Sequence, residues 1–400
     1  MTVAEYDNLF DVTKCQECGL CLSRCPVLRL SPEEARREKA RINRGDITPA
    51  VSRKCTSCFG CDFICPQGAN PCETIMQTWW EESRRTGILA RARFFLPTEK
   101  DNFRSYVTAR MARDEQALLS RWNDERPCAE FVYPGCNVCT VPYLIDTRLL
   151  PAVPVRGGLE WCCGEMLFRM GLYDVFAQQG RRMQDRFARM GARRIHMLCT
   201  AGTFIFSRVL PDRFGIKLDA EFLPLLQTWW DGLESGRIRV TKPLGLSATV
   251  QDSCYAKFLG REYFELPRRI LARIGVTVRE MPGSGCTTRC CGIGGGFSIQ
   301  SGFHVADLTQ SVMRVLLQAK GTGADVLCTY CAGCMQMLGT GATLLPRAPE
   351  IYHLLELLQL ATGETPKRRL KERARLMLIG VARHEARSVL APKRFFPRLK

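Results

Sequence analysis

The stretch Cys15-Gln16-Glu17-Cys18-Gly19-Leu20-Cys21-Leu22-Ser23-Arg24-Cys25-Pro26 decides how the chain begins to fold, and residues 55–66 repeat its pattern. Both stretches read C-x2-C-x2-C-x3-C-P, the spacing that holds [4Fe–4S] clusters. Three thiolates two residues apart can surround one side of a cluster, while the fourth binds the other cluster. The spacing therefore predicts two clusters. The first would be bound by Cys15, Cys18, Cys21 and Cys65, and the second by Cys55, Cys58, Cys61 and Cys25.

The segment between the two cysteine runs is predicted to be helical. Ser31 is suited to cap a helix, Pro32 to stand in its first turn, and Glu33 and Glu34 to interact with its positive end. The N-terminal module should therefore be built from helices. Two zinc sites or spare thiols are the alternative, which two matching runs with both prolines disfavour.

The composition is that of a globular chain with an unusual number of thiols. There are 22 cysteines in 400 residues, and the first residues show no secretory signal. We therefore expect metal thiolates in a reducing cytosol rather than disulfides. No apolar run is long enough for a membrane span. The histidines have no metal-site spacing, which leaves open only a lone axial ligand; they are His196, His304, His353 and His384.

The second part of the chain reads as two weak copies of one unit. In copy one an apolar strand ends near Cys136, a Cys162-Cys163-Gly164 turn follows, and a later strand ends near Cys199. Copy two repeats this order with Cys254, Cys290-Cys291-Gly292 and a final strand followed by Cys331 and Cys334. Apolar periodicity predicts helices over 173–190 and 306–319. Alternating strands and helices indicate α/β domains with parallel sheets, whose sites lie at the carboxyl ends of strands.

The chain resembles the cysteine-rich (CCG-domain) iron–sulfur subunits over about residues 10–360. The matching phrases are Tyr133-Pro134-Gly135-Cys136, residues 290–296 and Gly323-Ala324-Asp325-Val326-Leu327. This family includes the catalytic (D-type) subunit of heterodisulfide reductase and the iron–sulfur subunits of anaerobic glycerol-3-phosphate and glycolate dehydrogenases. The resemblance implies an α + α/β fold, with a helical two-cluster ferredoxin domain followed by two Rossmann-like CCG domains. We expect the boundaries 1–95 for the ferredoxin domain, 96–127 for a helical linker, 128–245 and 246–362 for the CCG domains, and 363–400 for a basic tail.

In heterodisulfide reductases each complete motif binds a noncubane [4Fe–4S] cluster through five cysteines. Carried over, copy two would supply Cys254, Cys290, Cys291, Cys331 and Cys334 as the catalytic centre, with Cys328 as an alternative ligand. The glycines Gly292, Gly294, Gly295 and Gly296 follow the cysteine pair. These glycines lack the strand–GxGxxG–helix order, so NAD binding is not expected. Copy one has Gly202 where the last cysteine would stand. Its thiols leave open zinc, a further cluster or no metal; they are Cys136, Cys162, Cys163 and Cys199, with Cys139 as an extra candidate.

The resemblance implies an oxidoreductase subunit that passes electrons between its two [4Fe–4S] clusters and a noncubane cluster that reduces or oxidises a disulfide. The alternative is a relay that links a flavoprotein dehydrogenase of glycerol-3-phosphate, glycolate or lactate type to membrane quinone. The expected partners are therefore other redox subunits, either a flavoprotein or a quinone- or cytochrome b-type membrane subunit. The expected location is the cytoplasmic face of the cell membrane.

Three lesser signals remain in the sequence. Net charge is +17, and residues 367–400 hold a net +10, which suits an anionic membrane surface but equally a solvated helix or a disordered tail. No nucleic-acid motif accompanies this charge, so no nucleic acid is expected as a partner. The pairs Trp79-Trp80 and Trp229-Trp230 are interpreted as core or subunit-contact residues. Asp252 could exchange a proton near Cys254 or serve in a turn.

Overall fold

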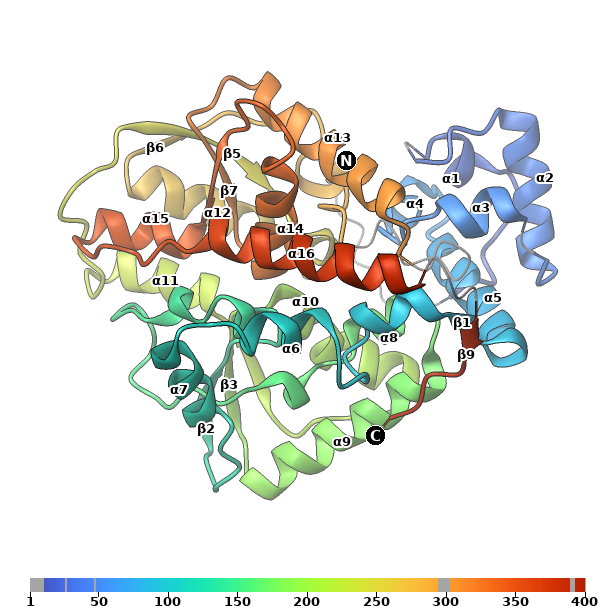
Figure 1. Cartoon of the computed structure of the whole chain (residues 1–400). Helices are drawn as coiled ribbons and strands as arrows, with labels where there is room; N and C mark the ends of the chain where they lie inside the picture. The colour runs from blue at the N-terminus through green and yellow to red at the C-terminus, as the bar shows by residue number, and fades with distance from the viewer. Residues whose placement is uncertain (1–10, 26, 47, 294–302, 389–392, 400) are drawn as a thin grey trace.

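The computed structural model describes residues 11–25, 27–46, 48–293, 303–388 and 393–399. A helical N-terminal module lies beside two units that each contain a parallel sheet (Figure 1). Glycines 294–296 and Pro26, which belong to the predicted motifs, lie outside the described residues. Of the helices described, none combines the length and the apolar character that crossing a bilayer requires.

The N-terminal module consists of short helices joined by the cysteine loops. Its predicted central helix begins after Ser31, whose Oγ accepts a hydrogen bond from the Glu34 N–H at 3.3 Å, while Glu34 Oε2 accepts one from the Ser31 N–H at 2.9 Å. This reciprocal cap and Pro32 in the first turn explain where the helix starts. The helices are α1 (Leu20–Ser23), α2 (Pro32–Asn43), α3 (Pro49–Lys54), α4 (Gly60–Ile64) and α5 (Pro71–Thr86).

The connection to the first sheet contains several short helical segments, of which α6 and α7 fall within residues 96–127. It contains β1 (Ile88–Leu89), η1 (Ala90–Phe95), α6 (Phe103–Thr108) and α7 (Arg113–Trp122). Strand β1 pairs antiparallel with β9 (Arg394–Phe395), so a segment near the C-terminus packs against the end of the N-terminal module. Gly87, at φ +68°, allows this contact, because a Cβ there would lie 2.5 Å from the Phe395 carbonyl oxygen.

The first α/β unit has a three-stranded parallel sheet in the order β2-β3-β4. The predicted helix over 173–190 is found as α9, and it ends at Gly191 in the left-handed conformation. The strands are β2 (Glu130–Tyr133), β3 (Arg194–Met197) and β4 (Glu221–Pro224). The helical segments are η2 (Val138–Thr140), η3 (Pro142–Ile145), η4 (Leu159–Trp161), α8 (Glu165–Arg169), α9 (Tyr173–Met190), α10 (Thr200–Phe204), η5 (Ile205–Arg213) and α11 (Leu225–Glu234).

The second α/β unit has a four-stranded parallel sheet in the order β6-β5-β7-β8. The helix expected over 306–319 is found as α13. The strands are β5 (Leu246–Gln251), β6 (Val276–Val278), β7 (Val326–Thr329) and β8 (Glu350–His353). The helical segments are η6 (Cys254–Phe258), α12 (Glu262–Arg273), η7 (Gly285–Thr287), α13 (Val305–Gly321), α14 (Ala332–Ala342) and α15 (Leu354–Ala361).

Strand register shows that the two units repeat one arrangement. Tyr133 at the end of β2 pairs with Met197 of β3, and Gln251 at the end of β5 pairs with Thr329 of β7. Cys136 follows Tyr133 by three positions, as Cys254 follows Gln251. Cys199 follows Met197 by two positions, as Cys331 follows Thr329. Cys136, Cys199, Cys254 and Cys331 therefore occupy equivalent carboxyl ends of strands, as the sequence predicted.

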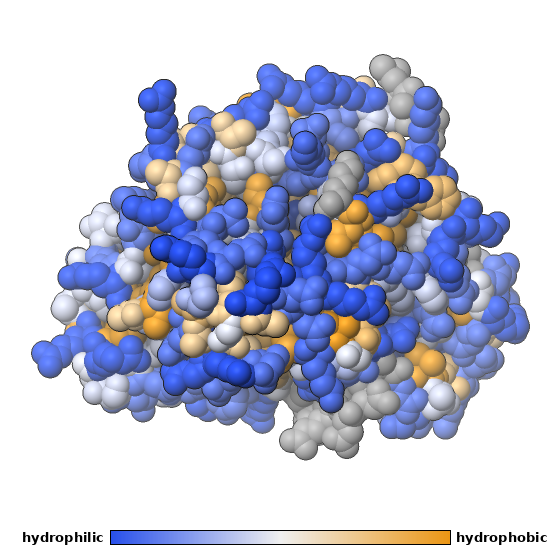
Figure 2. Space-filling model, turned by 90° about the horizontal axis from the view of Figure 1, so that it is seen from below, coloured by the Kyte–Doolittle hydropathy of each residue, from blue (hydrophilic) through white to orange (hydrophobic). Residues whose placement is uncertain are grey.

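The C-terminal helix α16 (Leu370–Ser388) lies across the body of the molecule, over α14 and beside α6 (Figure 1). Its inner face is buried at helical spacing through Leu370, Ala374, Met377 and Gly380. The interpretations of this segment as a solvated helix or a disordered tail are therefore wrong for α16. In Figure 2 the face seen is mainly hydrophilic, with hydrophobic residues in scattered small groups.

The tryptophan pairs each place one ring in the core. Trp79 and Trp229 are buried, and Trp229 Nε1 donates to the Leu149 carbonyl at 3.0 Å. Trp80 is half-buried and its Nε1 donates to Asp174 Oδ2 at 3.2 Å, while the Arg269 guanidinium lies over Trp230. The core interpretation is confirmed for Trp79 and Trp229.

Arg373 joins α16 to α7 through a buried ion pair with Glu115, which Arg369 also contacts at 2.8 Å. We expect Arg373→Met to lower the free energy of unfolding by about 3 kcal/mol, since removing one partner leaves a buried charge and Arg369 still offsets part of it. Denaturant-induced loss of helical circular dichroism measures this change. Arg375→Met is the matched control, because Arg375 is an exposed arginine of the same helix. Equal stability of the two variants would contradict the expectation.

Candidate iron–sulfur sites

The thiols predicted for the first cluster lie close together around Cys21. Burial raises the pKa of Cys21 to about 12, Lys39 opposes the rise, and the nearby thiols of Cys65, Cys15 and Cys18 add to it. The loop turns tightly because Glu17 and Gly19 have positive φ. Only glycine fits the second of these positions, since a Cβ would lie 2.5 Å from the Arg36 backbone nitrogen.

The thiols predicted for the second cluster surround a cavity of about 370 Å³. Its wall contains Cys25, Cys55, Cys58 and Cys61. The loop has the same turn as the first, with Ser57 and Phe59 in the left-handed region at the positions equivalent to Glu17 and Gly19. A bulky Phe in this conformation is strained, so its ring must contribute enough packing energy to hold it there.

The second α/β unit closes this cavity from the other side. Lys257 lines the cavity, and its Nζ donates to the Cys58 carbonyl at 3.3 Å. Thr288 and Arg289, which directly precede the Cys290-Cys291 pair, also line it. The second quartet therefore lies on the side of the N-terminal module that faces the thiols of copy two.

The five thiols predicted for the third centre form one connected group. Hydrogen bonds link Cys254 to Cys290, Cys290 to Cys291, Cys291 to Cys334 and Cys334 to Cys331. Hydrogen bonds from the Cys254 and Cys291 thiols lower the pKa of Cys290, and one from Cys334 lowers the pKa of Cys331. Two members are thus favoured as thiolates, the form that binds iron.

Cys328, the alternative ligand, lies apart from this group. It is inside β7, where it pairs with Val250 and Tyr352. Burial raises its pKa, and the nearby charges of Asp252 and Glu356 add to the rise. Its Sγ has the Thr329 carbonyl as a weak partner at 4.0 Å. The register equivalence described above matches Cys331, and not Cys328, with Cys199.

Arg169, which gave no signal in the sequence, connects the copy-two thiols to the second quartet. Its side chain is fully buried. Nη2 lies 3.4 Å from Cys254 Sγ and 3.8 Å from Cys290 Sγ, and Nε and Nη2 both donate to the Ser57 carbonyl at 3.1 and 3.0 Å. Nη1 also contacts Glu165 Oε1 at 3.3 Å. One guanidinium therefore touches the third candidate centre and the loop between Cys55 and Cys58.

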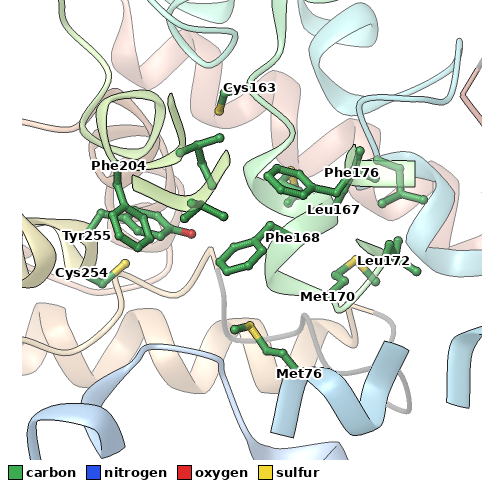
Figure 3. Packing of buried hydrophobic residues seen from close by; sticks show 14 of the residues in the cluster. Met76, Cys163, Leu167, Phe168, Met170, Leu172, Phe176, Phe204, Cys254 and Tyr255 are labelled. Carbon is green, nitrogen blue, oxygen red and sulfur yellow. The ribbon is translucent and has the colours of Figure 1, made fainter. Parts of the chain in front are cut away.

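Aromatic rings fill the space between the same two sites. Phe59 of the second cysteine loop packs against Tyr255 and Phe258, with ring centroids 5.7 and 5.1 Å apart. Phe204 stacks on Tyr255 at 5.5 Å, and Figure 3 shows these two rings together with the sulfur of Cys254 beside them. This packing accounts for a Phe at the strained loop position, and the rings are buried.

Copy one brings its thiols together less completely. Cys136 Sγ lies 3.5 Å from Cys162 Sγ, and Cys162 hydrogen-bonds Cys163. Burial and the charge of Cys331 raise the pKa of Cys199, which places the two copies' thiols near each other. Cys139 is buried near Cys136, and Cys139 Sγ has the Gly135 carbonyl as a weak partner at 4.0 Å.

Copy one also has its own buried arginine and its own missing ligand. Arg104 lies near enough to Cys136 and Cys162 to interact with their charges, and its Nη2 contacts Met166 Sδ at 3.0 Å. Gly202 occupies the position equivalent to Cys334, three residues after the strand-end cysteine. At the positions equivalent to the five copy-two thiols, copy one therefore offers four.

The other candidates are structural. The Arg268 guanidinium binds Asp252 through both oxygens at 3.0 and 2.9 Å, and the Tyr330 hydroxyl and the Gly285 N–H also donate to it. Asp252 is thus a tightly held turn residue. The histidines contact other groups: Glu130 for His196, the Ala306 N–H for His304, the Leu355 N–H for His353 and the Arg91 carbonyl for His384.

The donor set fits iron–sulfur clusters, which bind through cysteine thiolates. The thiols of the second quartet surround a cavity. Across the ranges of the chain given above, no three or more His, Cys, Asp or Glu side chains are arranged to hold a metal ion. A four-iron cluster is larger than one ion, so its ligands need to be spread around a space of their own. Cys72 and Cys286 also line this cavity, although their spacing in sequence gave no signal.

Two family models match the chain. A 4Fe-4S dicluster domain covers residues 11–69, and a cysteine-rich domain (CCG) covers residues 248–339. The first range contains both N-terminal quartets, and the second contains the five connected thiols. These matches confirm iron–sulfur clusters as the cofactors.

Known proteins with similar sequences include a reductase subunit and an oxidoreductase. The chain is 26% identical to the D subunit of dihydromethanophenazine:CoB--CoM heterodisulfide reductase of Methanosarcina barkeri over 405 residues, covering 89% of this chain and 95% of the relative. It is 25% identical to "EtfAB:quinone oxidoreductase" of Syntrophomonas wolfei, covering 76% of this chain and 45% of that relative. It is 33% identical to "Lactate utilization protein A" of Bacillus thuringiensis over 113 residues, covering 28% of this chain and 44% of the relative.

The sequence resemblance stated above is thus confirmed by matches that place the two domains in the predicted order. The chain is an electron-transferring iron–sulfur oxidoreductase subunit that joins a 4Fe-4S dicluster domain to a cysteine-rich CCG domain.

Proposed function

We propose that this chain passes electrons between two [4Fe–4S] clusters and a third, noncubane cluster at which a disulfide is reduced or two thiols are oxidised. The observation that carries the proposal is the connected group Cys254, Cys290, Cys291, Cys334 and Cys331, which Arg169 links to the second cysteine loop. Five thiols at one place are more than a zinc ion or a cubane cluster needs. The similarity to the heterodisulfide reductase of Methanosarcina barkeri supports the same function.

The proposed ligands follow the sequence prediction, in which the fourth cysteine of each run binds the cluster of the other run. The first cluster takes Cys15, Cys18, Cys21 and Cys65; the second takes Cys55, Cys58, Cys61 and Cys25; the third takes the five thiols of copy two. Bound clusters supply one-electron redox chemistry at each place. The two α/β units would be Rossmann-like CCG domains over about 128–245 and 246–362, of which only the second has a complete ligand set.

The protein's own side chains set the order of transfer in this proposal. Lys257 and Arg289 put positive charge on the cavity wall of the second quartet. Arg169 puts a further positive charge between that quartet and Cys254. The second cluster would therefore exchange electrons directly with the third, and the first would exchange them with a partner. Phe59 and Tyr255 would exclude water from the path between them.

A relay subunit is the second candidate, and the similarity to EtfAB:quinone oxidoreductase and Lactate utilization protein A favours it. In that function a flavoprotein would deliver electrons and membrane quinone would receive them, with the chain on the cytoplasmic face of the membrane. The basic surface of the C-terminal segment, with exposed Lys371 and Arg375, would attract anionic lipid there. The two functions differ in whether a thiol reaches the third cluster.

Iron and acid-labile sulfide analysis of the anaerobically purified chain tests the ligand assignment. We expect about twelve irons, because three complete ligand sets are present. About eight irons would remove the third cluster from the proposal. About sixteen would show that the four thiols of copy one hold a fourth cluster.

Oxidation in the presence of thiols separates the two functions. We expect the oxidised holoprotein to develop a new paramagnetic signal when CoM or CoB, the thiols in the Methanosarcina relative's name, is added. Electron paramagnetic resonance before and after addition detects it. A panel of other small thiols tests substrate range. No new signal with any thiol, in a protein with about twelve irons, would favour the relay function.

A further inference from the structure

Cys72 lies at the cavity of the second quartet although no cluster motif includes it. Its side chain is 1% exposed, and it lines the same cavity of about 370 Å³ as Cys25, Cys55, Cys58 and Cys61. Its thiol hydrogen-bonds that of Cys61. The cavity therefore presents five buried or half-buried thiols from the N-terminal module to one cluster that needs four.

The backbone holds Cys72 firmly in this place. Cys72 stands in the first turn of α5, and its N–H donates to Asp62 Oδ1 at 2.8 Å. Asp62 directly follows Cys61, and the Cys61 thiol has the same oxygen as a weak partner at 3.8 Å. One carboxylate thus fixes both thiol-bearing segments relative to each other. Helix α5 begins at Pro71, so the first turn of a regular helix places the Cys72 thiol at the cavity.

The first cysteine run has no counterpart of Cys72. Seven residues after Cys65 the chain has Cys72, whereas seven residues after Cys25 it has Pro32. The two runs are otherwise alike in spacing and in loop conformation. The additional thiol is therefore specific to the second site.

We propose that Cys72 is a reserve ligand of the second cluster, able to replace Cys25. Cys55, Cys58 and Cys61 come from one loop, whereas Cys25 comes from the first cysteine run. Cys72 lies in the same cavity, beside the loop that carries Cys55, Cys58 and Cys61. Exchange breaks the Cys25–iron bond and forms a Cys72–iron bond. One proton moves from the Cys72 thiol to the released Cys25, and no electron is transferred. The inference rests on the proposed ligand assignment of the second cluster.

Cys286 provides a matched comparison on the opposite wall. It lines the same cavity from η7 of the second α/β unit, but it is half-exposed. Cys286 interacts with the charges of Lys257 and Asp252. The Cys72 thiol, in contrast, is hydrogen-bonded to the thiol of Cys61, a member of the quartet. We therefore expect that Cys286 does not replace Cys25.

Iron content and the cluster spectra of anaerobically purified variants test the proposal. We expect Cys25→Ala and Cys72→Ala to keep the iron of the wild-type holoprotein, and Cys25→Ala/Cys72→Ala to lose about four irons. Cys25→Ala/Cys286→Ala should keep them. Visible absorption and paramagnetic signals of the first quartet report whether each variant is folded. If the alanine pair is insoluble, Cys25→Ala/Cys72→Ser preserves side-chain size and should lose the same cluster.

Each outcome decides between the alternatives. Loss of the cluster in Cys25→Ala alone, or its retention in the Cys25→Ala/Cys72→Ala pair, would overturn the proposal and leave Cys72 as a packing residue. Loss only with Cys286→Ala would give the reserve role to Cys286. Cys55→Ala tests the parent assignment separately. If that variant keeps all its iron, the ligand set of the second cluster is wrong, whatever the other variants show.

Discussion

Replacing Cys290 by alanine is expected to abolish the proposed third cluster and to leave the signals of both N-terminal quartets intact. Cys290 is the thiol to which Cys254 and Cys291 donate hydrogen bonds. Its Sγ lies 3.8 Å from Arg169 Nη2. Without it the remaining thiols cannot complete a five-ligand site. We expect a loss of about four irons and a fall in disulfide-reducing activity of more than about 100-fold, since even outer-shell changes cost about 10–100-fold. Anaerobic redox titration followed by paramagnetic resonance measures both sets of signals.

Cys328→Ala is the matched control for this prediction. Cys328 is also a buried thiol of the second unit, but it lies inside β7 and apart from the connected group. We expect it to keep all iron and nearly full activity, with at most a modest loss of stability from the small cavity. If Cys290→Ala keeps its iron while Cys328→Ala loses iron, the third centre has been assigned to the wrong thiols.

Arg169→Met should lower the reduction potential of the third cluster. The guanidinium lies 3.4 Å from Cys254 Sγ in a buried site, where its positive charge stabilises the more negative, reduced state. Methionine keeps the approximate volume and removes the charge. It also leaves Glu165 without its cation and the Ser57 carbonyl without two donors, so we expect a loss of about 3–5 kcal/mol in stability.

Arg169→Lys separates charge from geometry. Lysine retains the positive charge but cannot reach Ser57 and Cys254 with one planar fork. We therefore expect its potential to stay near that of the wild type while stability falls. An Arg169→Met variant whose third-cluster potential is unchanged or higher would contradict the electrostatic role, and the residue would then be purely structural.

The local parts of the fold could be predicted from the sequence. The helix α2 follows from its cap at Ser31, and α9 and α13 follow from apolar residues at helical spacing. The strand-end cysteines followed from the repeated order of strand, Cys-Cys-Gly turn and helix. These signals lie within a few residues of the feature that they predict, so one sequence was enough to find them.

The contacts that connect the sites could not be predicted in this way. Arg169 reads as an ordinary charged residue of a helix, and Ser57 is 112 positions away. The thiol of Cys72 belongs to no motif spacing, and only the fold brings it to the second quartet. The charge of the C-terminal segment gave the wrong interpretation of α16, because a charge count does not reveal that Glu115 neutralises Arg373 in the interior.

The position of Lys257 and Arg289 on the second cavity wall has a consequence for biosynthesis. While the chain is still being translated, the pocket for the second cluster would be open to solvent. Oxygen and small-molecule thiols could then enter it. The pocket closes only after segments that are translated much later have folded against it. Cluster insertion should therefore follow translation. In air, a fragment that ends before residue 257 should lose its second cluster faster than the full chain does.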